Sequence, residues 1–278
     1  MTHARGVVIG LVLALGACNG EVGRGTGDGG APPPGDGAPP AADGAPAGDA
    51  AGATDGAAGD AAAAPGDGGG LACQADDHQH TGEATYYTFA DGTGNCSFPA
   101  TPADLMLGAM NHVDYAASAV CGGCVRLTGP NDTITIRIVD QCPECPQGNI
   151  DLSPQAFERI AALSAGRVAI SWQYVSCGVT GPIVYHFKEG SNQWWTAVQI
   201  RDSRNRIATV EYRAAGGAYE AVPRLDYNYF VAASGMGPGP YAFRVTDVYG
   251  HVLEDTGIPF VEAGDAAGAG QFPACAGP

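Results

Sequence analysis

The sequence predicts a mainly β protein with two folded domains that follow a long segment unable to form a core. Residues 19–70 consist almost entirely of Gly, Ala, Pro and Asp, which bury too little apolar surface to offset the entropy cost of ordering. Residues 71–179 and 181–278 instead contain many short stretches of alternating apolar and polar residues between turn-forming residues. We therefore expect a disordered tether and two β domains.

The first 18 residues have the pattern of a lipoprotein-type export signal. A basic start precedes an apolar run too short to span a membrane, and the run ends in Leu15-Gly16-Ala17-Cys18, which resembles a bacterial lipobox. This pattern predicts cleavage before Cys18 and a lipid anchor on its thiol. The expected location is the bacterial cell surface or outer membrane, or the medium after release. An ordinary signal peptide is the alternative.

The first domain is predicted to hold alternating strands and one helix. Strands are expected over CVRLTGP and TITIRIVDQ, with a turn at residues 129–132 between them. A helix is expected after Ser153, because serine caps helix N-termini and Pro154 suits the first helical position. The segment RVAISWQYVSC then returns as a strand, with Trp172 in the core.

The second domain is predicted to be a β-sandwich, because short alternating segments recur about every ten residues. These segments are IVYHFKEG, WWTAVQIRD, IATVEYR, AYEAVPRL, YNYFVAA, YAFRVTDVYG and HVLEDTGI. In the second of them, simple strand alternation would place Trp194 toward the core and Trp195 outside.

The charge balance restricts the expected partners. The formal net charge is −16, and the two domains remain acidic without the tether. Nucleic acid and acidic polysaccharides are therefore poor partners, whereas a neutral polymer is unaffected by this charge. The sequence has no nucleotide-binding glycine motif, and no cofactor is expected.

The cysteines are expected to form disulfides. The chain has nine, and removal of Cys18 leaves an even number in an exported chain. The spacings Cys121-x-x-Cys124 and Cys142-x-x-Cys145 would also suit a zinc site. Export and the even count favour disulfides over metal, so no metal is expected, and the residues alone leave the pairing open.

Several longer motifs resemble the bacterial and microbial expansins, which loosen cell walls without hydrolysis. They are HTGEATYYTF, CGGCVRLTGP, TIRIVDQCPEC, GNIDLSPQAFERIA and NQWWTAVQIRD…RLDYNYF, in the family's order over about residues 80 to 260. The resemblance implies a six-stranded double-psi β-barrel similar to family 45 glycoside hydrolases, followed by an immunoglobulin-like cellulose-binding domain. It implies binding to cellulose or a related neutral cell-wall glucan, by a chain expected to be a monomer.

The resemblance also implies the residues of a polysaccharide groove. Asp151 matches the family's acid-like aspartate, Asp140 a second groove aspartate, and Thr85 the first threonine of a Thr-x-Thr pair. This chain departs from the family twice, because Tyr87 replaces the second threonine and Cys142 falls where the family has an aromatic residue.

In the second domain the resemblance implies an exposed aromatic platform of Trp194, Trp195 and Tyr227, with Lys188 nearby. Planar aromatic side chains bind the flat C–H faces of sugars by apolar contact. A twisted strand start or a bulge would bring both indoles to one face. The alternatives are that Trp194 and Tyr227 belong to the core.

Similarity to plant expansins implies two disulfides, Cys96–Cys121 and Cys124–Cys177. The cysteines that remain would then pair as Cys142–Cys145 and Cys73–Cys275.

The acid-like Asp151 precedes the predicted helix, where the helix terminus favours its anion unless burial raises its pKa. A role in bracing the loop is the alternative.

Glycoside hydrolysis needs a second carboxylate, which the related hydrolases carry on the first barrel strand. Here residues 84–88 hold no acid, although Glu83 and Asp91 flank them. The expectation is binding and loosening without an enzymatic step. The alternatives are an endoglucanase, a peptidoglycan lytic transglycosylase, and a surface adhesin for plant material.

Overall fold

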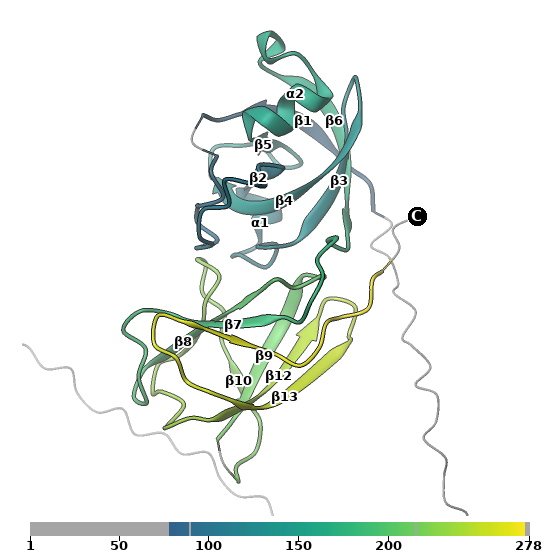
Figure 1. The fold of residues 1–278 in the computed structure, drawn as a ribbon. Coiled ribbons are helices and arrows are strands. Elements are labelled where there is room, and N and C mark those ends of the chain that lie inside the picture. The colour runs from purple at the N-terminus through teal and green to yellow at the C-terminus, as the bar shows by residue number, and fades with distance from the viewer. Residues whose placement is uncertain (1–77, 89, 215, 276–278) are drawn as a thin grey trace, which may run out of the picture. The chain divides into compact units, whose positions relative to one another are not determined.

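The computed structural model describes residues 78–88, 90–214 and 216–275, and the structural statements below concern these residues. They form two β domains in succession (Figure 1). The predicted export signal, the tether and Cys73 lie outside the described residues. Within the described ranges, no helix is long and apolar enough to cross a membrane.

The first domain is a closed six-stranded barrel. Around the barrel the strands follow the order β1-β5-β2-β4-β3-β6, with β1 parallel to β5 and β2 parallel to β4. Because these parallel pairs join strands that are not consecutive in the chain, β1 and β5 bring residues about 65 positions apart into register. The strands are β1 His80–Tyr86, β2 Leu107–Asn111, β3 Cys124–Thr128, β4 Thr133–Cys142, β5 Ile150–Leu152 and β6 Val168–Val175.

The predicted barrel helix is present as α2, Pro154–Ile160. Its N-cap is Ser153, whose hydroxyl accepts a hydrogen bond from the backbone N–H of Ala156 at 3.0 Å and donates one to the carbonyl of Leu105 at 2.5 Å. The predicted burial of Trp172 is also found, at 1% exposure, with its indole N–H on the carbonyl of Gly148. Two shorter helical segments are α1, His112–Tyr115, and the 3-10 turn Leu163–Ala165.

The second domain is a β-sandwich of two four-stranded sheets, ordered β10-β9-β12-β13 and β11-β8-β7-β14. Rings from both sheets meet in its core, where Tyr185 stacks on Phe243 at 4.7 Å between centroids. The strands are β7 Val184–Phe187, β8 Thr196–Arg201, β9 Ile207–Arg213, β10 Glu220–Val222, β11 Phe230–Ala232, β12 Tyr241–Asp247, β13 Val252–Ile258 and β14 Asp265–Ala267. All but β14 fall within the predicted segments.

Three of the expected disulfides are present. Cys96–Cys121 and Cys124–Cys177 lie in the barrel domain, and Cys142–Cys145 closes a short loop after β4. These bonds use all four cysteines that the zinc alternative would need as thiolate ligands. The fourth expected pair involves Cys73, which lies outside the described residues, so that pair stays a prediction.

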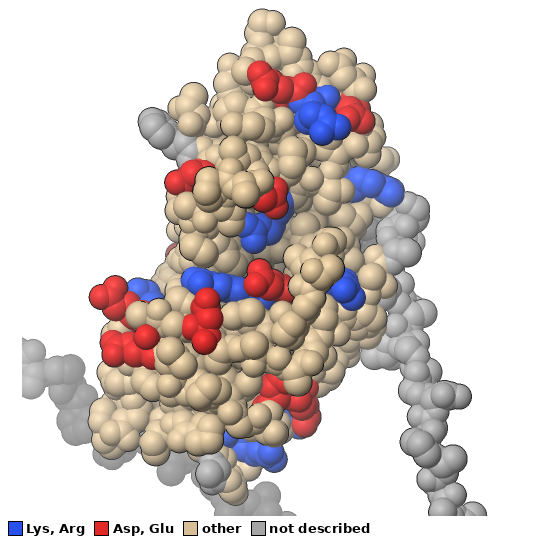
Figure 2. Space-filling model, viewed as in Figure 1, with Lys and Arg blue, Asp and Glu red and all other residues tan. Residues whose placement is uncertain are grey.

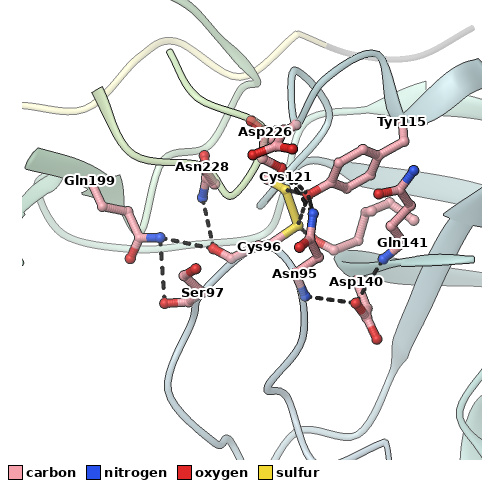
Figure 3. The surroundings of a disulfide bond; sticks show 12 residues. Asn95, Cys96, Ser97, Tyr115, Cys121, Asp140, Gln141, Gln199, Asp226 and Asn228 are labelled. Atoms are coloured by element: carbon pink, nitrogen blue, oxygen red, sulfur yellow. Dashed lines mark hydrogen bonds between the residues drawn. A yellow bond between two sulfur atoms is a disulfide. The ribbon is translucent and has the colours of Figure 1, made fainter. Parts of the chain in front are cut away.

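A set of hydrogen bonds, of which those to the Cys96 carbonyl are buried, joins the two domains (Figure 3). The carbonyl of Cys96 in the barrel accepts from the side-chain amides of Gln199 at 2.8 Å and Asn228 at 3.1 Å. The Asn95 amide and the Tyr115 hydroxyl both donate to the carbonyl of Asp226, at 2.9 and 3.0 Å. We call these contacts the interdomain network.

A second group of contacts extends the interdomain network to one side. The Ser118 hydroxyl donates to the carbonyl of Leu225 at 2.7 Å, and the guanidinium of Arg224 donates to the carbonyl of Ser118 at 3.0 Å. Ser118 is fully buried, so water does not reach its hydroxyl and carbonyl groups. These two protein hydrogen bonds satisfy them instead.

Replacement Ser153→Ala is expected to lower the free energy of unfolding by about 1–3 kcal/mol, because it removes the cap of α2 and leaves the partly buried carbonyl of Leu105 without its donor. The measurement is a urea unfolding curve of the barrel transition. Ser164→Ala, at an exposed serine of the 3-10 turn, is the control and should change it little. Equal effects of the two variants would contradict the capping role.

Candidate functional site

Two of the predicted groove residues meet across neighbouring parallel strands. Thr85 of β1 is in register with Asp151 of β5, and its hydroxyl donates to the Asp151 carboxylate at 2.5 Å. The adjacent Ala84 is fully buried in the barrel core, so strand alternation turns Thr85 to the outside. The barrel thus places a threonine and a carboxylate together on its outer surface, where both remain partly exposed.

The pKa of Asp151 is raised, in contrast to the effect expected from the helix terminus. Burial is the largest cause, and the charges of Glu144 and Asp140 act in the same direction, whereas the hydrogen bond from Thr85 opposes them. Ser153, and not Asp151, caps the helix. Asp151 therefore loses its proton less readily than an ordinary aspartate does.

The second groove aspartate, Asp140 in β4, is held in a fixed orientation by backbone donors. Its carboxylate accepts from the N–H of Asn95 at 2.6 Å and from the N–H of Gln141 at 2.8 Å. Gly94 passes so close that a Cβ there would lie 2.5 Å from the Asp140 carboxyl carbon. A larger residue at Gly94 would therefore displace the carboxylate.

Tyr87, one of the departures from the family pattern, lies among the carboxylates. Its hydroxyl is buried and has no hydrogen-bond partner among the described residues. Burial raises the pKa of Tyr87, and the charges of Asp140, Asp151 and Asp91 raise it further. The phenol therefore keeps its proton and is a donor beside the groove.

The other departure leaves the groove without an aromatic face at that position. Cys142 is 5% exposed and bonded to Cys145, so it offers no flat surface to a sugar. Of the two flanking acids, Glu83 forms an ion pair with Arg167 at 2.7 Å. Asp91 accepts hydrogen bonds from Thr93, which lower its pKa.

Trp194 is the most exposed large apolar residue described, at 72%, so the prediction from simple alternation that it faces the core is wrong. The reason is that β8 begins only at Thr196. Residues 192–195 form a tight turn, in which the side-chain oxygen of Asn192 accepts from the N–H groups of Trp194 and Trp195 at 2.9 and 3.2 Å. A turn capped by asparagine, rather than a bulge, therefore brings Trp194 to the surface.

The remaining platform residues form a small cluster separate from the sandwich core. Partly buried Trp195 and Tyr227 pack against buried Ala197, Tyr229 and Val231. Because Val198 and Ile200 of β8 face the core, Ala197 places this cluster on the outer face of the sheet. Tyr227 is thus half-buried at the surface and is not a core residue.

Tyr229 is a member of this cluster that the sequence analysis did not single out. Its ring lies 5.8 Å from that of Tyr227, and the Lys188 ammonium lies 5.9 Å from its centroid. The spacing of two residues between the tyrosines is the available signal, since it places both on one side of an extended segment.

Asn95 connects the groove to the platform. Its backbone N–H donates to Asp140, and its side-chain amide donates to the carbonyl of Asp226, the residue before Tyr227 (Figure 3). Thr85, Asp140 and Asp151 therefore lie near one another on the barrel, and Trp195 and Tyr227 lie in one cluster on the sandwich. Asn95 hydrogen-bonds both Asp140 and the residue before Tyr227.

Comparison with known proteins identifies the family. A family model described as lytic transglycolase matches residues 79–172. Expansin-YoaJ of Bacillus subtilis (strain 168) is 33% identical over 197 residues, which cover 69% of this chain and 84% of that protein. The chain belongs to the expansin family. Expansin-like protein 1 of Dictyostelium discoideum is also 33% identical, over 193 residues that cover 65% of this chain and 66% of that protein.

Solved expansin structures share the fold of this expansin. The apo form of the Clavibacter michiganensis expansin aligns with a TM-score of 0.67 and 34% identity, covering 70% of this chain and 99% of that one. A point mutant of the same protein, solved in complex with cellohexaose, aligns with a TM-score of 0.66 and 33% identity over the same shares of the two chains.

Replacement Thr85→Val is expected to raise the pKa of Asp151 further, because it removes the hydrogen bond that stabilises the carboxylate while burial is unchanged. The measurement is an NMR titration of the Asp151 side-chain carboxyl. Thr81→Val, at an exposed threonine of the same strand that faces Ser171 of β6, is the control.

The same pKa shift has a consequence for stability. A carboxyl such as Asp151, whose pKa is higher in the folded than in the unfolded protein, stabilises the fold at a pH below its unfolded pKa. This contribution is lost as the pH rises through the folded pKa.

Two results of the NMR titration would contradict the assignment. They are an Asp151 pKa at or below its ordinary value, and an equal change of that pKa in Thr81→Val.

Proposed function

We propose that this expansin binds cellulose or a related neutral cell-wall glucan and loosens it without hydrolysis. The observation that supports this proposal is the pair of hydrogen bonds by which Asn95 connects Asp140, in the proposed groove, to Asp226, next to Tyr227 of the proposed platform. Trp194, Trp195 and Tyr227 would contact the flat faces of the sugar rings, while Thr85, Asp140 and Asp151 would hydrogen-bond the hydroxyls of one chain.

Surface charge supports a neutral ligand. On the face drawn in Figure 2, acidic and basic side chains are scattered in small groups of both signs, with no extended patch of one sign. With a formal net charge of −16, the protein would repel an acidic polymer at long range, whereas a neutral glucan meets no such barrier.

Loosening would follow from differential binding. A glucan chain in a wall coheres with its neighbours through many weak contacts. A ligand shifts an equilibrium only by its difference in affinity for the two states. A groove that binds a twisted chain better than a flat one would therefore lower the free energy needed to separate that chain from its neighbours.

The absence of hydrolysis is proposed from the groove itself. The strand that would carry the second carboxylate places Thr85 opposite Asp151, and Glu83 is paired with Arg167. Without a base held across the bond from the acid, water is not activated for attack.

A lytic transglycosylase is the second candidate, favoured by two observations. The family model described as lytic transglycolase covers 79–172, and burial raises the pKa of Asp151. A carboxyl whose pKa is raised by burial is better suited to general-acid catalysis than an ordinary aspartate. Cleavage of peptidoglycan without water would need only this acid.

We also propose that Cys18 carries a lipid anchor and that residues 19–70 link it to the two domains. The lipobox-like ending Leu15-Gly16-Ala17-Cys18 and the Gly, Ala, Pro and Asp composition of the linking segment support this arrangement. A single chain would then act on polysaccharide at the cell surface or, after release, in the medium.

The experiment mixes the purified protein with amorphous cellulose or with peptidoglycan sacculi, and measures bound protein and released sugar ends. Binding to cellulose without released ends is expected. Trp194→Ala should weaken this binding about tenfold, because exposed aromatic contacts dominate such interfaces. Val252→Ala, at a half-exposed valine of β13 in the other sheet, is the matched control.

Two outcomes would contradict the proposal. Failure of the protein to bind cellulose would exclude the binding role. Release of ends that stops in Asp151→Asn would establish an enzyme instead, and the polymer that releases them would identify it as an endoglucanase or a transglycosylase.

A further inference from the structure

A hollow lies beside the junction between groove and platform. Its volume is about 630 Å³, within the usual range for small-molecule sites. Two of its lining residues contact Asn95, which joins the two domains. The Asn95 side-chain amide donates to the Tyr115 hydroxyl and to the Asp226 carbonyl, both at 2.9 Å. The lining residues are His112, Val113, Tyr115, Ala116, Ala117, Gln141 and Asp226.

An unusual backbone forms one wall of the hollow. After α1, the three residues Ala116, Ala117 and Ser118 have φ angles of 48°, 50° and 69°, although none is glycine. Such conformations are costly for non-glycine residues and persist only where surrounding contacts enforce them. The bonds of Ser118 to Leu225 and Arg224 supply these contacts. Strain held in this way is concentrated at functional sites.

The wall presents an apolar side chain to solvent. Val113 of α1 is 58% exposed, although the buried core of the barrel is close by. Two of the other lining residues, Ala116 and Ala117, are exposed and add carbon surface around it. This surface gives the hollow an apolar floor of the kind that receives the C–H face of a sugar ring.

Polar groups border the same surface. The Gln141 side-chain nitrogen lies 2.6 Å from His112 Nδ1, and both residues are at the edge of the hollow. These two side chains form no other hydrogen bond within the part of the chain that the structure describes. The Gln141 amide oxygen and His112 Nε2 are therefore available to sugar hydroxyls. An apolar floor with a few polar groups is the usual composition of a small-ligand site.

We propose that this hollow is a junction subsite, which binds a sugar unit of the same neutral glucan chain as it passes from groove to platform. The inference rests on the proposed function and adds a position to it. Val113 contacts the ring face, and His112 with Gln141 bonds its hydroxyls. The charged side chain Asp226 lines the hollow, and neither Lys nor Arg does, so a neutral sugar is favoured over an anionic one.

The test compares two exposed valines. Val113→Asp places a carboxylate under the sugar, where it would lose its hydration. It is expected to weaken binding to a soluble long-chain β-glucan about tenfold, as measured by affinity electrophoresis or calorimetry. Val252→Asp, at 50% exposure on β13, adds the same charge away from the hollow and should bind like the unchanged protein.

A second variant examines the polar edge without altering the groove. Gln141→Ala removes the side-chain amide, but the backbone N–H that holds Asp140 remains. It should also weaken binding. Val113 is exposed and Gln141 is partly exposed, so neither replacement alters the buried core, and a circular dichroism spectrum checks the fold.

The outcomes separate the subsite from the proposed function. If Val113→Asp and Gln141→Ala bind the glucan normally while Trp194→Ala binds weakly, the junction subsite is wrong and the proposed function stands. Equal weakening by Val113→Asp and Val252→Asp would also overturn the subsite, because the effect would then be one of charge alone. If the unchanged protein does not bind the glucan, both are wrong.

Discussion

The arrangement of the site depends on one buried carbonyl. The oxygen of Cys96 accepts from Gln199 and Asn228, which are 0% and 5% exposed, and the Cys96–Cys121 disulfide fixes its position in the barrel. Loss of these partners would leave a buried acceptor unsatisfied, at a cost of about 1–3 kcal/mol. Removing these donors while the domains stay in contact therefore costs more than losing a single exposed hydrogen bond.

In the proposed function, this constraint joins two modest binding surfaces into one. The groove carboxylates and the aromatic platform each offer a few contacts, and neither encloses a ligand. When both are held at a fixed separation, a glucan bound at one is presented to the other at high effective concentration. Asn95 makes this connection short, since one residue bonds the Asp140 carboxylate with its backbone and the Asp226 carbonyl with its side chain.

Local features of the fold followed from the sequence, and long-range ones did not. Ser153 and Pro154 marked the start of α2, and alternation located β3, β4 and most sandwich strands. β2 is buried at all five positions and so has no alternation to detect. The exposure of Trp194 depends on the Asn192 turn. The resemblance supplied the residues of the proposed groove and platform. The amides that join the two domains carry no sequence pattern, because their partners are backbone carbonyls far along the chain.

The most direct test of a single binding surface is to weaken the interdomain network while leaving groove and platform unchanged. The double variant Gln199→Ala/Asn228→Ala removes both donors to the Cys96 carbonyl. Its affinity for a soluble long-chain β-glucan should fall about tenfold or more, while its weak affinity for a short cello-oligosaccharide stays constant. Unchanged affinity for the long chain, in a folded variant, would show that the two surfaces bind independently and would contradict the account.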